Sequence, residues 1–142
     1  MRIADVLRGK GGAVVTINPE ATVTELLAGL ASHNIGAMVV SGPDGVKGIV
    51  SERDVVRQLH ANGPSVLSEP VQRIMTTVVS TCTKSDTVDS LTMLMTENRV
   101  RHVPVLEDGE LIGIVSIGDI VKTRMQELES EHEQLQSYIT QG

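Results

Sequence analysis

One nine-residue pattern occurs twice in the chain and constrains the fold more than any other feature. Residues 48–56 read Gly-Ile-Val-Ser-Glu-Arg-Asp-Val-Val, and residues 113–121 read Gly-Ile-Val-Ser-Ile-Gly-Asp-Ile-Val, at an offset of 65 residues. In each copy an apolar, β-branched stretch ends at a serine and a helix-like stretch follows, so both copies predict a strand-to-helix turn. The chain therefore contains two copies of one α/β unit.

The residues around this pattern repeat at the same offset. A short strand at 13–17 precedes a helix capped by Thr22, with Glu25 three residues on. Strands at 37–40 and 46–50 are joined by a turn containing Pro and Gly, and a second helix begins near Glu52. The expected fold class is α/β of the α+β type, with two β-α-β-β-α repeats and an extended C-terminal helix.

The Ser-x-x-Asp turn has two interpretations. It is a helix-capping box, in which the serine accepts a hydrogen bond from a first-turn N–H and the aspartate reaches back to the cap. It is also a place where a strand end meets a helix N-terminus, which favours an anionic ligand. Both interpretations apply to each copy.

With Arg-His-Val-Pro-Val at residues 101–105 ahead of the second copy, the paired pattern resembles the cystathionine-β-synthase (CBS) domain family, as a tandem pair or Bateman module. The resemblance implies that the repeats pack about a pseudo-twofold axis into one disc-like module with two clefts for adenosine-containing ligands. The expected bounds are 8–66 for the first repeat, 73–130 for the second and 131–142 for a helical extension.

The resemblance also implies which residues bind the ligand. One cleft would combine Ser51 and Asp54 with Val79, Ser80 and Thr81 against the base and with Arg101 and His102 against phosphate. The other would combine Ser116 and Asp119 with Val14, Val15 and Thr16, and Arg53 could reach across to supply its missing cation. An ionised aspartate only accepts hydrogen bonds and therefore suits the two hydroxyls of a ribose.

Composition excludes several classes of function. A net charge of −6 disfavours DNA or RNA as a partner, and Tyr138, the single aromatic residue, offers no stacking platform for bases. No apolar run is long enough to cross a membrane, so a cytoplasmic protein is expected. Cys82, the single cysteine, is expected to be buried and inert, and the four histidines show no metal-ligand spacing.

Three further segments carry expectations. Residues 9–12, rich in glycine, and residues 65–69 are interpreted as linkers. Apolar residues between Val121 and Ile139 recur at heptad spacing, with His132 as a polar exception. This helix either pairs with a second copy of the chain or lies on its own module.

Three hypotheses of function follow. The first is a non-enzymatic sensor that binds AMP, ADP or ATP, with NAD or S-adenosylmethionine as other adenosyl ligands, and signals to a protein target on another chain. The second is a homodimeric interaction module with vestigial clefts. The third, an enzyme, is weakest because no nucleophile is paired with a base in a recognisable arrangement. No catalytic residue is therefore assigned.

Overall fold

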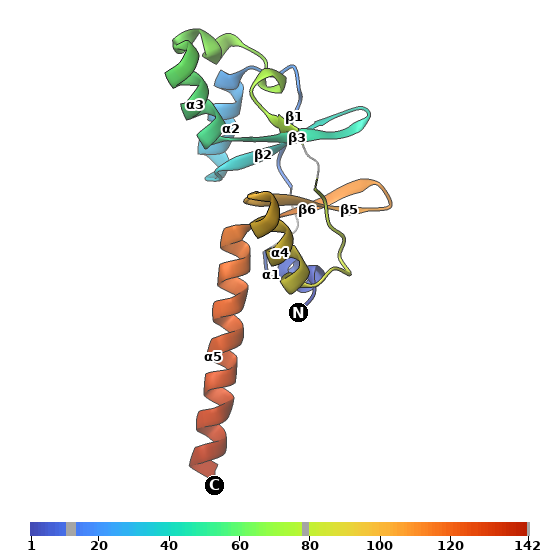
Figure 1. Ribbon diagram of the computed structural model, residues 1–142, viewed down its shortest axis with the longest axis vertical. Coiled ribbons are helices and arrows are strands. Elements are labelled where there is room, and N and C mark those ends of the chain that lie inside the picture. The colour runs from blue at the N-terminus through green and yellow to red at the C-terminus, as the bar shows by residue number, and fades with distance from the viewer. Residues whose placement is uncertain (11–13, 78–79, 142) are drawn as a thin grey trace.

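The computed structural model describes residues 1–10, 14–77 and 80–141 (Figure 1). The first part of the chain forms α1 (Ile3–Lys10), β1 (Thr16–Ile17), α2 (Val23–His33), β2 (Ala37–Gly42), β3 (Gly45–Ser51) and α3 (Glu52–Asn62). Two 3-10 helices, η1 (Pro64–Ser68) and η2 (Val71–Arg73), lead to β4 (Thr76–Thr77). The second part forms α4 (Val88–Asn98), β5 (His102–Glu107), β6 (Glu110–Ser116) and α5 (Ile117–Gln141).

Matching caps begin and end the first helix of each half. Thr22 accepts a hydrogen bond from the Glu25 N–H at 3.1 Å, and Thr87 accepts one from the Ser90 N–H at 3.0 Å. Both helices end at a residue in the left-handed conformation, Asn34 in α2 and Arg99 in α4. The repeat in sequence is therefore a repeat in local structure.

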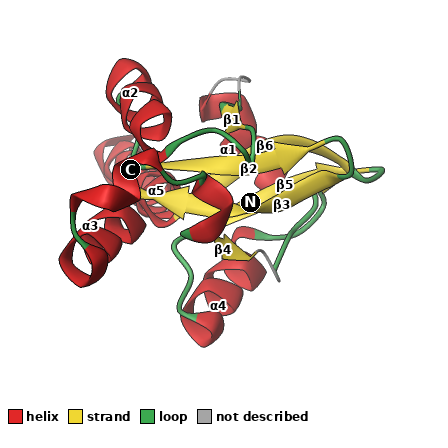
Figure 2. Cartoon of the chain, turned by 90° about the horizontal axis from the view of Figure 1, so that it is seen from above, coloured by secondary structure: helices red, strands yellow, loops and turns green. Residues whose placement is uncertain are grey.

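The strands form two hairpins in the same register. β2 pairs antiparallel with β3, with β1 and β4 at the edges of that sheet, and β5 pairs antiparallel with β6. The hairpins stack with β3 against β6, with α2 and α3 outside one and α1 and α4 outside the other (Figures 1 and 2). Val39 and its counterpart Pro104 are buried but belong to neither core cluster. Because strand residues alternate between faces, we place both side chains between the hairpins.

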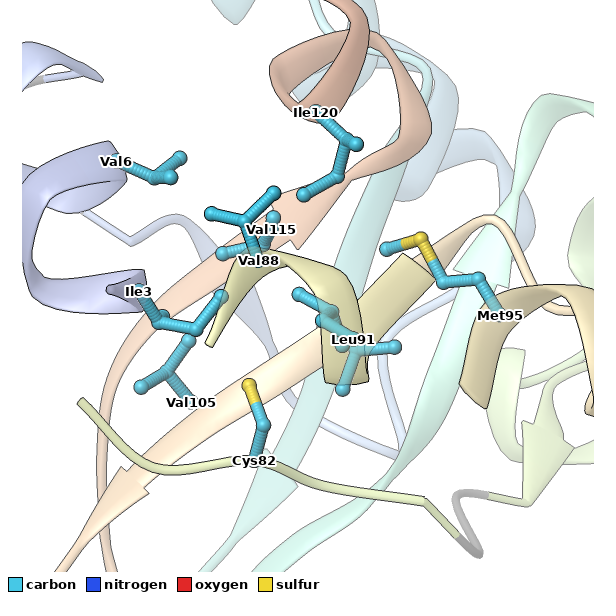
Figure 3. Packing of buried hydrophobic residues seen from close by; sticks show 10 residues of the cluster. Ile3, Val6, Cys82, Val88, Leu91, Met95, Val105, Val115 and Ile120 are labelled. Carbon is cyan, nitrogen blue, oxygen red and sulfur yellow. The ribbon is translucent and has the colours of Figure 1, made fainter. Parts of the chain in front are cut away.

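Each half has its own hydrophobic core. The first core contains Val23, Leu26, Leu30, Met38, Val40, Val50, Val55, Val66, Val71 and Ile74. The second core contains Ile3, Val6, Cys82, Val88, Leu91, Met95, Val103, Val105, Val115 and Ile120, most of them labelled in Figure 3. Cys82 is buried, as expected, and burial raises the pKa of its thiol to about 12. A thiol with this pKa stays protonated and unreactive.

The segment ahead of each repeat packs on the other repeat. The N–H groups of Ile3 and Ala4 in α1 donate to the carbonyls of Asp86 and Lys84 in the second half. The N–H of Val71 in η2 donates to the carbonyl of Ala21 in the first half. α1 thus completes the second core and η2 completes the first.

Several expectations of local structure are wrong. Gly9 and Lys10 continue α1, because the apolar side of this helix is held against the second core. Residues 65–68 lie in η1, which buries Val66 in the first core, and do not form a linker. Val14 and Val15 are not in a strand, since only Thr16 and Ile17 pair with β2. Gly11, Gly12 and Ala13 lie outside the described residues.

Candidate functional site

A cleft of about 670 Å³ lies between the two repeats. It is lined by Gly36, Ile49, Ser51, Glu52, Arg53, Asp54, Arg57, Thr76, Thr77, Ser80, Asn98, Arg99, Val100, Arg101, His102, Ser116, Ile117 and Gly118. Both repeats contribute, because the start of α3 from one half faces the end of α4 and the start of β5 from the other. Polar, aliphatic and cationic side chains therefore meet in one cleft.

The start of α3 is a complete capping box. The Ser51 hydroxyl oxygen accepts from the Asp54 N–H at 3.3 Å, and Oδ2 of Asp54 accepts from the Ser51 N–H at 2.8 Å and from the Ser51 hydroxyl at 3.1 Å. All hydrogen bonds of the Asp54 carboxylate within the described residues use Oδ2. The capping interpretation is confirmed, and Oδ1 of Asp54 accepts no hydrogen bond from the described residues.

The corresponding aspartate of the second repeat has a further partner. Oδ2 of Asp119 accepts from the Ser116 N–H at 2.8 Å and from Nζ of Lys10 at 2.8 Å, and the same ammonium donates to the carbonyl of Ile114 at 2.6 Å. Partial burial alone would raise the pKa of Asp119, but the hydrogen bonds and charge of Lys10 and the bonds from Ser116 lower it below its ordinary value. The carboxylate of Asp119, unlike that of Asp54, is therefore paired with the ammonium group of Lys10.

His102 lies partly buried at the start of β5, beside Arg101. Desolvation by burial lowers the pKa of His102, and the positive charges of Lys10 and Arg101 act in the same direction. The carbonyl of Arg101 accepts from the Ile117 N–H at 2.9 Å, which fixes the backbone there. The Arg101 side chain is exposed and lines the cleft.

The structure brings together part of the residue set expected from the sequence. Ser51, Asp54, Ser80, Arg101 and His102 line this cleft, as expected. Arg53 and Ser116, which were expected to serve the other cleft, line this one instead, because the start of α5 faces the start of α3 across it. Thr81 is exposed and, like Asp119 and residues 14–16, is not among the lining residues. Val79 lies outside the described residues.

Sequence reasoning missed several residues of the site. Arg57 and Arg99 line the cleft, and Lys10 bonds to Asp119. A signal for the two arginines was available, because their counterparts at the 65-residue offset are Lys122 and Asn34, so the halves differ there. No signal pointed to Lys10, whose glycine-rich surroundings are typical of a linker.

The family model of the CBS domain matches residues 11–61 and 71–125. The chain belongs to the CBS domain family. With two matches it is a tandem CBS pair, a Bateman module, and the expected fold of two β-α-β-β-α repeats with a long C-terminal helix is confirmed.

Known CBS proteins resemble most of the chain or nearly all of it. CBSX3 of Arabidopsis thaliana, a mitochondrial CBS domain-containing protein, is 37% identical over 99% of this chain and 72% of its own length. The crystal structure of a CBS-domain containing protein from Agrobacterium tumefaciens is 42% identical, with a TM-score of 0.83, over 87% of this chain and 99% of that one. A CBS domain protein from Pyrobaculum aerophilum, complexed with AMP, is 28% identical, with a TM-score of 0.74, over 84% of this chain and 89% of that one.

In residues 1–10, 14–77 and 80–141, no helix combines the length and the hydropathy that a bilayer span requires. In the same ranges, no three His, Cys, Asp or Glu side chains lie close enough together to hold a metal ion.

Proposed function

We propose that this CBS pair is a non-enzymatic sensor that binds an adenine nucleotide in the cleft at Asp54 and signals to another protein chain. One observation carries the proposal: the cleft unites a carboxylate with a free acceptor oxygen, aliphatic side chains and cationic side chains from both repeats. These are the groups that a ribose, an adenine ring and a phosphate need. The AMP bound to the relative from Pyrobaculum aerophilum supports the ligand class.

Each part of the ligand has a counterpart in the cleft. Oδ1 of Asp54 would accept from the ribose hydroxyls while Oδ2 keeps the helix cap. Ile49 and Val100 would contact the faces of the base, near Ser80. Arg101 would meet phosphate, with His102 neutral beside it at pH 7 because its pKa is lowered. AMP, ADP and ATP fit these groups best, and NAD and S-adenosylmethionine share the adenosine contacts.

The second cleft is proposed as the weaker one. Asp119 and residues 14–16 would form it by repeat symmetry, whereas Ser116 lines the first cleft. The ammonium of Lys10 competes there with ribose hydroxyls for Asp119. Gly36 and Ala37 stand at the positions of Arg101 and His102. We therefore expect one tight nucleotide site for each chain.

A specific observation favours pairing of two copies as part of the function. Five apolar residues of α5 (Val121, Met125, Leu128, Leu135 and Ile139) are at least half exposed and recur at heptad spacing. Exposed apolar seams of this kind pair with a second helix. We propose a homodimer as the signalling form, acting in the cytoplasm on a protein target in trans.

Replacement of Asp54 tests the sensor. Asp54→Ala should weaken binding of AMP or ATP by about ten- to a hundredfold in isothermal titration calorimetry, because hydrogen bonds to a charged group contribute about 1.5–3 kcal/mol. Loss of the cap should also cost about 0.5–2 kcal/mol of folding stability. AMP or ATP recovered after incubation with the wild-type protein should be chemically unchanged, because a non-enzymatic sensor does not cleave its ligand.

Asp119→Ala is the matched control. It removes the equivalent capping carboxylate from the second repeat together with its ion pair to Lys10, so it should lower stability by at least as much and change nucleotide affinity much less. If both variants lose stability and neither loses affinity, then Asp54 is a helix cap alone and the vestigial-cleft interpretation is correct.

A further inference from the structure

The cleft at Asp54 collects an unusual amount of positive charge. Arg53 and Arg57 enter it from α3, Arg99 from the end of α4 and Arg101 from just ahead of β5. The chain contains eight arginines and has a net charge of −6, so half of its arginines line one cleft of an acidic protein. Charge of this density in a concave site attracts anions.

The other repeat shows that the fold does not require these arginines. At the 65-residue offset the counterparts of Arg53 and Arg57 are Gly118 and Lys122. The counterparts of Arg99 and Arg101 are Asn34 and Gly36. The same strand, turn and helix therefore form with one cation in place of four. The additional positive charge is therefore a feature of this cleft, and the fold itself does not require it.

None of the four guanidinium groups has an acidic partner in the part of the chain that the structure describes. The ion pairs found there involve other cations, such as Arg73 with Glu69 and Lys84 with Glu107. The acidic residues that line the cleft are Glu52 and Asp54, and Asp54 is engaged in the cap. The cleft therefore has a surplus of positive charge that a bound anion would neutralise.

Arg99 adds an independent observation from the backbone. It caps α4 in the left-handed conformation, with φ 54° and ψ 39°. Glycine and asparagine adopt this conformation at low cost, and Asn34 occupies the equivalent position in the first repeat with φ 53°. The second repeat thus has the long side chain of Arg99 where the first repeat has Asn34, a residue that adopts this conformation at lower free-energy cost. Backbone conformations of this kind cluster at ligand sites.

The helix N-terminus can do little of the anion binding itself. The Glu52 N–H donates to the carbonyl of Gly36 at 3.0 Å, and the Asp54 N–H is taken by Ser51. Contact with phosphate therefore falls to the side chains. Guanidinium groups suit this role because each one presents several donors in a plane that matches phosphate oxygens.

Building on the proposed function, we propose that the ligand of this cleft is an adenine nucleoside triphosphate, and that Arg57 and Arg99 bind the phosphates beyond the first. Arg101 and Arg53 hold the phosphate nearest the ribose. A single phosphate would leave part of the surplus charge unneutralised, and the cationic sulfonium of S-adenosylmethionine would be repelled. The cleft thus selects for the length of the phosphate chain.

Calorimetry with the intact chain tests this selection. Adenosine, AMP, ATP and S-adenosylmethionine are titrated at one ionic strength without divalent cations. We expect ATP to bind at least about tenfold more tightly than AMP, and AMP more tightly than adenosine. Arg57→Gln and Arg99→Asn should each lower the affinity for ATP by about tenfold and change the affinity for AMP by less than about twofold. Added salt should lower the affinity for ATP more than the affinity for adenosine, because only ATP carries charged phosphates.

Two features keep the variants interpretable. Arg99→Asn installs the residue of the first repeat at a position whose backbone favours asparagine, so it should not lower the melting temperature. Lys122→Gln removes one positive charge at the counterpart of Arg57, outside the lining of this cleft, and should leave ATP affinity unchanged.

The outcomes separate the two levels of the proposal. Three results would overturn the selection for a triphosphate and leave the nucleotide sensor unaffected. They are equal affinity for AMP and ATP, equal losses of affinity for both nucleotides in the arginine variants, and tighter binding of S-adenosylmethionine than of ATP. Absence of binding for all four ligands would overturn the sensor itself.

Discussion

Asp54 and Asp119 occupy equivalent positions in the two repeats, yet their carboxylates face different surroundings. Both cap a helix through Oδ2, but only Asp119 also accepts from Lys10. The side chain of Asp119 is 20% exposed and that of Lys10 is 34% exposed, so solvent screens the pair only partly. The two copies of the motif thus differ in their partners, because only the second is tied to α1.

The Lys10–Asp119 pair predicts a pH-dependent contribution to stability. Lys10→Met should lower the free energy of unfolding at pH 7 by at most about 1 kcal/mol, measured by urea denaturation. Because the pKa of Asp119 is lowered in the folded state, this stabilisation is complete above the unfolded-state value of about 3.9. It is lost as the pH falls through the lower, folded-state pKa.

His102 offers a second measurement on the same variant. The positive charge of Lys10 contributes to the lowered pKa of His102, so Lys10→Met should raise this pKa, followed by NMR titration of the imidazole. Asp119→Asn, by contrast, removes a nearby negative charge and should lower it further. A His102 titration unchanged in both variants would mean that neither charge lies near the imidazole in solution.

At the scale of elements, glycines decide how closely the neighbouring segments dock on the hairpins. A Cβ at Gly48 would lie 2.5 Å from the carbonyl oxygen of Thr76 and 2.8 Å from Sδ of Met75. A Cβ at the equivalent Gly113 would lie 2.6 Å from Cδ2 of Leu7 in α1. The Leu7 side chain can rotate away, whereas the backbone of β4 can move only by breaking its pairing with β3.

The two glycines should therefore respond unequally to substitution. Gly48→Ala should destabilise the protein by about 3 kcal/mol and Gly113→Ala by about 1 kcal/mol, compared by chemical denaturation. Gly48→Ala should also weaken nucleotide binding, since Thr76 and Thr77 of β4 line the cleft. Combining Gly113→Ala with Leu7→Ala should give less than the sum of the two losses. Full additivity would show that Leu7 and residue 113 do not touch.

Elements whose signals are local were predictable from the sequence. The threonine caps, the hairpins and the Ser-x-x-Asp turns depend on residues within a few positions of one another. The extension of α1 to Lys10 and the burial of Val66 in η1 were missed because distant contacts decide both. The site shows the same contrast between local and distant signals. Arg99 lines the cleft from the C-terminus of α4, which the Ser-x-x-Asp motif does not include, so the motif could not predict it.

At the scale of the whole molecule, α5 extends away from the stacked hairpins (Figure 1). Its 25 residues continue well beyond Thr123, which is buried, and from Leu128 onward its large apolar residues are exposed. A helix of this length gains most of its stability from packing. A second α5 would supply that packing along the apolar seam.

We expect light scattering at micromolar concentration to give twice the mass of one chain. Leu128→Glu with Leu135→Glu should shift the protein to monomer, because charges at seam positions repel across the helix pair and remain unpaired. Both residues are more than 60% exposed, so the folded chain should tolerate the change. Gln126→Glu with Gln134→Glu is the control, since it adds the same two charges at exposed heptad positions b and c, on the side of α5 away from the seam. A wild-type monomer would contradict the proposed homodimer.

The reciprocal docking of α1 and η2 makes each half of the chain depend on the other half. The segment that leads into each repeat completes the core of the other repeat, through equivalent hydrogen bonds to the strand-to-helix region of the partner half. This is the arrangement of a domain-swapped dimer, fused into one polypeptide. Neither repeat therefore has a complete core with only the segment that directly precedes it, and each half depends on the leading segment of the other.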